Sequence, residues 1–150
     1  MMVDFVYSSA CPCSTELSFH AAEKRGVYGI PHSQRSCARV MLEFDDMIWI
    51  EDVVKLLREI LQTETLVFCK RVDEQAYSEL NGANVKFVED AARLIADGLN
   101  NWDLVDDYKV IVSHQESLHS HDAISVITKG LPGSIFSPNV SMDEFQSLVC

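Results

Sequence analysis

The sequence predicts an α+β domain in which an antiparallel four-stranded sheet carries two helices on one face. Four short segments are rich in β-branched and aromatic residues, which is typical of strands. Two longer segments between the second and third strands repeat apolar residues at helical spacing. The order strand, strand, helix, helix, strand, strand predicts two hairpins joined into one sheet that packs against both helices.

The strands are expected at residues 2–8, 37–44, 108–113 and 123–128. The first leads directly to Cys11. The second alternates apolar and polar residues, and an Asp pair that can cap the following helix ends it. A polar segment separates the last two strands.

The helices are expected at residues 50–61 and 85–102. Their buried sides should hold the recurring apolar positions, which are Ile50, Val53, Val54, Leu57, Ile60 and Leu61 in the first helix and Val85, Val88, Ala92, Leu94, Ile95 and Leu99 in the second. Glu89 falls in the opening turns of the second helix, where the helix dipole stabilises a carboxylate.

The remaining segments are expected to be irregular. Residues 9–36 are rich in Ser, Gly and Pro and predict a long loop with a short helical piece at 16–24. Residues 63–84 show no clear period. Ser141 and Glu144 form a capping-box pattern for a short last helix. We therefore expect one module over residues 1–130, which carries the functional site, and a tail over residues 131–150.

The charge of the chain argues against a nucleic-acid partner. Its 150 residues carry a formal net charge of −11, and the basic residues are dispersed rather than clustered. A phosphate group in a ligand would therefore be held by a few local cations, for which the candidates are Arg35, Lys70, Arg71 and Lys86.

The cysteines indicate a reducing compartment. The chain has five cysteines, and Cys11 and Cys13 are too close in sequence for an unstrained disulfide. The first residues do not resemble a secretion signal, and no apolar run is long enough to span a bilayer. We expect a cytoplasmic protein with reduced thiols and no membrane partner.

Four side chains in loops or at strand ends form a candidate metal site. Cys11, His32, Glu74 and His119 supply one thiolate, two imidazoles and a carboxylate, a set that suits Zn²⁺, Mn²⁺ or Fe²⁺. By themselves these residues leave the alternative open that the thiols are ordinary and the histidines are surface residues, as we expect for His20.

Five motifs in order resemble a known family. They are Cys-Pro-Cys-Ser at 11–14, Tyr-Gly followed by His-Ser-Gln-Arg-Ser at 28–36, Lys-Arg-Val-Asp-Glu at 70–74, Lys-Phe-Val-Glu-Asp at 86–90 and Glu-Ser-Leu-His-Ser-His at 116–121. Together, over residues 5–128, they resemble the prokaryotic type IB GTP cyclohydrolases of the tunnelling-fold superfamily. The resemblance is to the C-terminal module of that family and implies its ββααββ unit.

The resemblance also implies roles for individual residues. Cys11, His32, Glu74 and His119 would be the metal-site residues, and Cys13 would be the second active-site cysteine, catalytic together with Cys11 and His32. Glu89 would anchor the guanine ring, because a carboxylate can accept hydrogen bonds from both N1 and the 2-amino group. Arg35 and His121 would be further substrate-binding residues, whereas His114 is expected to be solvated or structural.

The implied reaction is hydrolysis of GTP at C8. Metal-bound water would supply the hydroxide, formate would leave, and ring closure would give 7,8-dihydroneopterin triphosphate, the first step towards folate. Cys13 would take part in proton transfer or stabilise an intermediate.

Two departures from the family pattern stand out. The segment between Cys13 and His32 is longer than the compact family version, and only one module is present where family members carry two. Because one open sheet leaves two unpaired edges, we expect a homo-oligomer joined through those edges.

Three rival interpretations remain open from the sequence. One is the archaeal-type cyclohydrolase, which gives a cyclic phosphate product. Another is the nitrile reductase branch of the superfamily, which needs NADPH. The third is a single-module relative that keeps the fold but acts as a binding or assembly partner without turnover.

Overall fold

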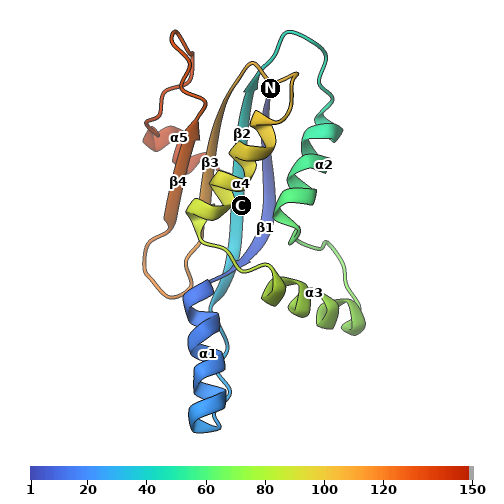
Figure 1. The fold of residues 1–150 in the computed structure, drawn as a ribbon, viewed down its shortest axis with the longest axis vertical. Coiled ribbons are helices and arrows are strands. Elements are labelled where there is room, and N and C mark those ends of the chain that lie inside the picture. The colour runs from blue at the N-terminus through green and yellow to red at the C-terminus, as the bar shows by residue number, and fades with distance from the viewer. Residues whose placement is uncertain (149–150) are drawn as a thin grey trace.

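The computed structural model describes residues 1–148 and contains one four-stranded sheet with helices (Figure 1). In chain order the elements are β1 (Met2–Ala10), α1 (Pro12–Arg25), β2 (Ser33–Glu43), α2 (Ile50–Leu61), α3 (Arg71–Ala83), α4 (Val88–Asn100), β3 (Asp107–His114), β4 (Ala123–Thr128) and α5 (Met142–Gln146). The predicted α+β class is confirmed.

The sheet has the strand order β1-β2-β3-β4, and every neighbouring pair is antiparallel. The register places Tyr7 opposite Ser36 and Ser36 opposite His114. Side chains alternate between the two faces of a strand, so these three residues share one face at the end of the sheet where β1 and β3 finish. That end is where the loops carrying the predicted site residues meet.

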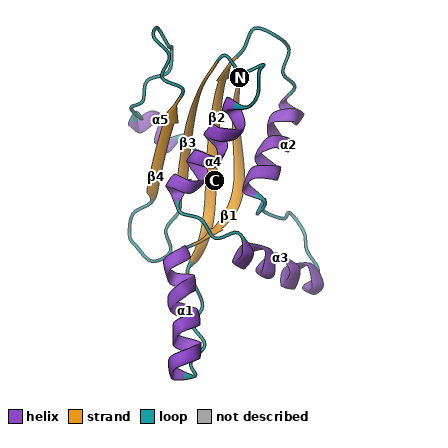
Figure 2. Ribbon diagram, in the orientation of Figure 1, coloured by secondary structure: helices purple, strands orange, loops and turns teal. Residues whose placement is uncertain are grey.

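The helices α2 and α4 pack on one face of the sheet, as predicted (Figure 2). Their apolar stripes are buried against the strands, with Leu57, Leu61, Ile95 and Leu99 fully enclosed. The prediction that Ile50 and Leu94 lie on the buried sides is wrong, because these side chains are 50% and 45% exposed. The core therefore forms between the helix pair and the sheet.

The predicted loop over residues 9–36 is wrong in extent, since half of it forms the helix α1, which projects away from the sheet (Figure 1). The short helical piece predicted at 16–24 is confirmed as part of this longer helix. Pro12 begins the helix, and Gly26 ends it in a left-handed conformation with φ 64°. Of its residues only Ala21 is buried. Because α1 packs little apolar surface, its sequence carries no strong apolar period.

The predicted irregular segment over residues 63–84 is also wrong in its second half, which forms α3. No residue of α3 is buried, so the apolar period that marks α2 and α4 is missing here. The Asp73 carboxylate accepts a hydrogen bond of 2.8 Å from the Lys70 backbone N–H and caps the helix start.

The segment at residues 63–65 pairs with part of the outer edge of β1. The Ser8 N–H donates to the Thr63 carbonyl at 2.8 Å, and the Thr65 N–H donates to the Val6 carbonyl at 3.3 Å. The expectation that both edges are free is therefore wrong for this part of β1.

The tail covers part of the sheet face opposite the helices. The predicted capping box at Ser141 and Glu144 is present and begins α5. Lys109 and Arg39, both buried, hydrogen-bond to Glu144 and Ser147 of the tail. Among the described residues, no helix is both long and apolar enough to cross a membrane.

Candidate active site

A pocket of about 300 Å³ lies at the end of the sheet where β1 and β3 finish and α4 begins. It is lined by five of the residues that the sequence singled out, Cys11, His32, Glu89, His119 and His121. These residues come from separate parts of the chain, so the fold brings them together.

Backbone pairing fixes Cys11 and His32 beside each other. Cys11 follows β1 and His32 precedes β2, and the last pair of this antiparallel ladder joins Ala10 to Ser33. The Cys11 N–H donates to the His32 carbonyl at 3.2 Å, and the His32 N–H donates to the Ser14 hydroxyl at 3.2 Å. The long insertion of α1 between them thus leaves both ends in register.

Glu89 reaches the pocket from the first turn of α4. The start of this helix is held at the sheet end because the Lys86 N–H donates to the Ala10 carbonyl at 3.3 Å. His119 and His121 approach from the segment between β3 and β4, and their rings stack with centroids 5.2 Å apart. Both imidazoles are exposed, as is Glu89.

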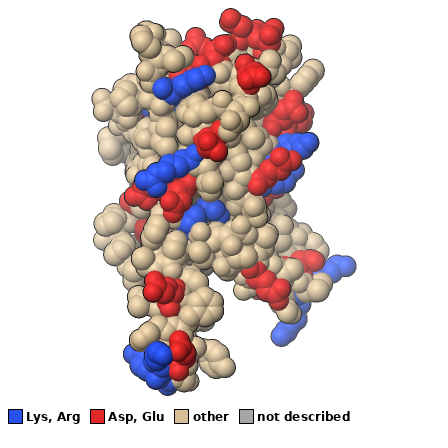
Figure 3. All heavy atoms as spheres, in the orientation of Figure 1, with Lys and Arg blue, Asp and Glu red and all other residues tan. Residues whose placement is uncertain are grey.

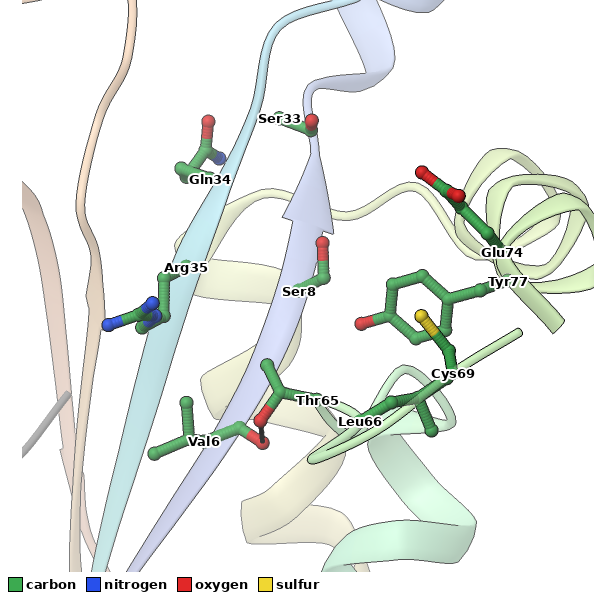
Figure 4. Close-up of a pocket in the computed structure, with 10 residues that line it drawn as sticks. All are labelled: Val6, Ser8, Ser33, Gln34, Arg35, Thr65, Leu66, Cys69, Glu74 and Tyr77. Atoms are coloured by element: carbon green, nitrogen blue, oxygen red, sulfur yellow. Dashed lines mark hydrogen bonds between the residues drawn. The ribbon is translucent and has the colours of Figure 1, made fainter. Parts of the chain in front are cut away.

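Three predicted site residues lie outside this pocket. Glu74 and Arg35 line a separate open groove of about 730 Å³ along β1, together with Cys69 and Tyr77 (Figure 4). Glu74 projects from α3 toward the end of β1, whereas the side chain of Arg35 points away from Glu74. Cys13 is exposed in the first turn of α1.

The four predicted metal-site residues do not form one cluster. Within residues 1–148, no three His, Cys, Asp or Glu side chains lie close enough together to hold a metal ion. Cys11, His32 and His119 share the pocket, but Glu74 lies in the groove. The predicted metal set therefore stays a prediction, with three of its members lining one cavity.

His114 is a buried member of the pocket whose place the sequence did not indicate. Its Nε2 lies 2.8 Å from the Tyr7 hydroxyl and its Nδ1 lies 3.2 Å from the Ser9 hydroxyl. Burial, assisted by the positive charge of Lys86, lowers the pKa of His114 from 6.5 to about 4. At neutral pH this imidazole is uncharged, and the solvated alternative for His114 is wrong.

Lys86 places a buried ammonium group at the same pocket. Its Nζ donates to the carbonyls of Asn84 at 2.6 Å and Leu61 at 3.2 Å. Burial lowers its pKa from 10.5 to about 8. The sequence suggested Lys86 only as one of several possible phosphate contacts.

Glu116 is a second residue of the pocket to which the sequence assigned no role. Its side chain is 13% exposed, and its Oε2 lies 3.6 Å from Nδ1 of His32. Among the described residues this buried oxygen has no hydrogen-bond partner. Its position three residues before His119, within a recognised motif, was the available signal.

Comparison with known proteins points to one family. A profile described as type I GTP cyclohydrolase FolE2 matches residues 1–125. The chain belongs to the FolE2 family of type I GTP cyclohydrolases. Since the profile spans β1 to the start of β4, it includes every residue of the pocket.

Individual FolE2 proteins are similar over most of this chain. The GTP cyclohydrolase FolE2 of Dinoroseobacter shibae is 58% identical over 134 residues, which are 87% of the chain and 36% of the relative. That of Cereibacter sphaeroides is 54% identical over 132 residues, covering 87% and 37%. That of Ruegeria sp. is 49% identical over 150 residues, covering 98% and 40%. This FolE2-family chain thus spans between a third and two fifths of the length of these relatives.

Proposed function

We propose that this chain carries the catalytic pocket of a type IB GTP cyclohydrolase, corresponding to the C-terminal module of that group. The reaction is hydrolysis of GTP at C8 with release of formate, leading to 7,8-dihydroneopterin triphosphate. The observation that carries the proposal is the convergence of Cys11, His32, His119 and Glu89 on one cavity. The family relationship and the GTP cyclohydrolase names of the relatives support it.

Glu89 is the proposed anchor for the guanine ring. Its carboxylate lines the pocket at the N-terminal turn of α4, where the helix dipole favours a negative charge. Two oxygens on one carboxylate can accept hydrogen bonds from N1–H and the 2-amino group together. This arrangement would place C8, on the far side of the purine, away from Glu89.

The proposed cofactor is a divalent ion, Zn²⁺, Mn²⁺ or Fe²⁺. The thiol of Cys11 and the imidazoles of His32 and His119 have the right donor chemistry and share the pocket. When bound, such an ion supplies a hydroxide near neutral pH for attack at C8. Glu74 completes the proposed set only if α3 moves. No residue of α3 is buried, but the Tyr77 hydroxyl donates to the Thr63 carbonyl at 3.0 Å and the Asn81 amide donates to the Ser8 hydroxyl at 2.9 Å, so both hydrogen bonds would have to break.

Proton transfer is proposed for Cys13, and substrate binding for His121. Cys13 lies one residue beyond Pro12 in the opening turn of α1, and its thiol is exposed to an approaching substrate. His121 lines the pocket beside the stacked ring of His119. A thiol can act as a general acid or base. The triphosphate contact proposed for Arg35 requires the substrate to extend from the pocket into the groove.

The test is formate release from GTP with added Zn²⁺ or Mn²⁺. We expect turnover by the wild-type chain and a loss of roughly 100-fold or more in Cys11→Ala and in Glu89→Gln. Glu59→Gln, an exposed glutamate on α2, is the matched control and should retain full activity. Mass analysis of the product separates the triphosphate from a cyclic phosphate.

The competing interpretation is a relative that binds metal without turnover. It is favoured by the separation of Glu74 from the other three proposed ligands. Wild-type protein that binds the ion but releases no formate with any of the three metals would establish this alternative and overturn the enzymatic proposal.

We also propose a cytoplasmic homo-oligomer joined through sheet edges. In the described part of the chain, β4 pairs with β3 on one side only, so its other edge can join a second copy. The free thiols at Cys11, Cys13 and Cys69 fit a reducing compartment. Light scattering should give a mass well above 16.9 kDa at working concentration, and a monomer would contradict the assembly.

A further inference from the structure

A chain of hydrogen bonds links the imidazole of His32 to the buried interior. Nδ1 of His32 lies 3.1 Å from Oε1 of Gln34, and Nε2 of Gln34 donates to the Ser9 hydroxyl at 2.8 Å. The same hydroxyl lies 2.8 Å from the Ser36 hydroxyl and 3.2 Å from Nδ1 of His114. All members except His32 are buried. The site imidazole is thus held from its inner side.

The hydrogen count at Ser9 is consistent with the amide orientation of Gln34. A hydroxyl has one hydrogen to donate and two lone pairs to accept with. Ser9 accepts from Gln34, which leaves one acceptor and one donor role for Ser36 and the uncharged His114. Either arrangement of these two roles satisfies every contact. The buried end of the chain is therefore complete when Gln34 donates inward.

With the amide in this orientation, its oxygen faces His32 and sets the tautomer of that imidazole. A carbonyl oxygen can only accept, so Oε1 of Gln34 requires a hydrogen on Nδ1. The reverse orientation of the amide would place an N–H against a lone pair on Nδ1 instead. Ser9 could still satisfy its partners in that case, so a second contact is needed to choose between the two.

Glu116 supplies that second contact. Its Oε2, buried and without a hydrogen-bond partner among the described residues, lies 3.6 Å from Nδ1 of His32. A carboxylate attracts an N–H and repels a nitrogen lone pair, and the effect is stronger in a buried environment than in water. Gln34 and Glu116 therefore favour the same hydrogen position.

We propose that Gln34 is a positioning residue that, with Glu116, holds His32 in the Nδ1–H tautomer. The lone pair then lies on Nε2, the nitrogen that can bind a ligand or accept a proton in the pocket. A histidine whose second nitrogen is held by an acceptor is fixed in both ring orientation and tautomer. The inference rests on the proposed function only where it gives Nε2 a role in the pocket. The tautomer of His32 is a property of the chain without metal or substrate.

The direct test is a long-range ¹H–¹⁵N spectrum of the uniformly ¹⁵N-labelled chain, without metal or GTP, at alkaline pH. We expect wild-type His32 to carry its hydrogen on Nδ1. In Gln34→Met the ratio of Nδ1–H to Nε2–H should fall roughly two- to tenfold, the effect of one ordinary hydrogen bond. It should fall further when Glu116→Gln is added.

Two control variants separate positioning from general disruption. Gln34→Glu keeps an acceptor against Nδ1 and should preserve the wild-type ratio. Gln115→Met alters an exposed glutamine and should also leave it unchanged. Zn²⁺ affinity measured by competition with a chelator should drop roughly tenfold in Gln34→Met and recover in Gln34→Glu.

A wild-type spectrum with the hydrogen on Nε2 of His32 would overturn the inference without any variant. An unchanged ratio in folded Gln34→Met would do the same. Neither result depends on formate release, so failure of this inference and failure of the proposed function are separately visible.

Discussion

At the scale of single residues, strand alternation decides which polar side chains reach the pocket. Gln34 and Ser36 lie on the face of β2 that carries α2 and α4, so they join Ser9 and His114. Arg35 lies between them in sequence and points to the other face, where it lines the groove. A motif that looks continuous in sequence is thus divided between two surfaces.

His114 should make the fold sensitive to acid. Its pKa is about 4 in the folded chain and near 6.5 when unfolded, so its contribution is complete above pH 6.5 and is lost as the pH falls towards 4. From pH 7 to pH 5 we expect the free energy of unfolding to drop by roughly 2 kcal/mol from this group. Urea unfolding at several pH values measures it.

The comparison variant is His114→Gln, which cannot titrate and should show a flatter pH profile. The groups that face His114 are Tyr7, Ser9 and the ammonium of Lys86, none of which changes charge in this interval. His20→Gln, on exposed α1, should keep the wild-type slope. If the free energy of unfolding falls equally steeply with pH in wild type and in His114→Gln, His114 is not the source of the acid sensitivity.

At the scale of elements, burial determined what could be predicted. The apolar period revealed α2 and α4 because these helices pack on the sheet, and alternation revealed the strands. The period was absent in α1 and α3, which bury one residue and none. Their signals were local, namely Pro12 and Gly26 around α1 and the capping Asp73 at α3.

Gly26 should set the end of α1. Its φ of 64° is strained for any residue with a side chain, although a Cβ would meet open space there. Gly26→Ala should weaken the last turn by about 1 kcal/mol, seen as faster amide hydrogen exchange of that turn. Gly82 lies inside α3, and a Cβ there would also meet open space. Gly82→Ala should instead slow amide hydrogen exchange in α3, because alanine favours a helix more than glycine does. Equal effects of the two changes would refute this explanation.

The docking of α5 should depend on the charge of Glu144. Hydrogen bonds from Lys109 and from the Ser141 backbone lower the pKa of Glu144 to about 2. The ionised Glu144 therefore stabilises the docked tail fully at pH values above its ordinary pKa of 4.5. This stabilisation is lost as the pH falls towards 2. At neutral pH, Glu144→Gln should accelerate amide exchange in α5 roughly tenfold.

The control for α5 is Asp143→Asn, a neighbouring exposed acid. It should leave exchange in α5 close to wild type at neutral pH. Unchanged exchange in Glu144→Gln would show that the ion pair with Lys109 does not hold the tail.

At the scale of the whole molecule, Figure 3 shows acidic and basic side chains scattered over a largely uncharged face, with one group of basic side chains at the far end of α1, where Lys24 and Arg25 lie. Most of the pocket could be predicted because its residues occur in recognisable motifs. The buried partners Ser9, Gln34 and His114 could not be assigned roles, since only the register of β1, β2 and β3 brings them together.

The central claim is that donors from distant segments bind one ion in the pocket. Titration of the chain with Co²⁺, which substitutes for Zn²⁺ and absorbs visibly when a thiolate binds it, tests this most directly. We predict a thiolate-to-cobalt band that is lost in Cys11→Ser and weakened in His32→Ala and His119→Ala, but kept in Cys69→Ser. A band that survives in Cys11→Ser, or disappears in Cys69→Ser, would contradict the account.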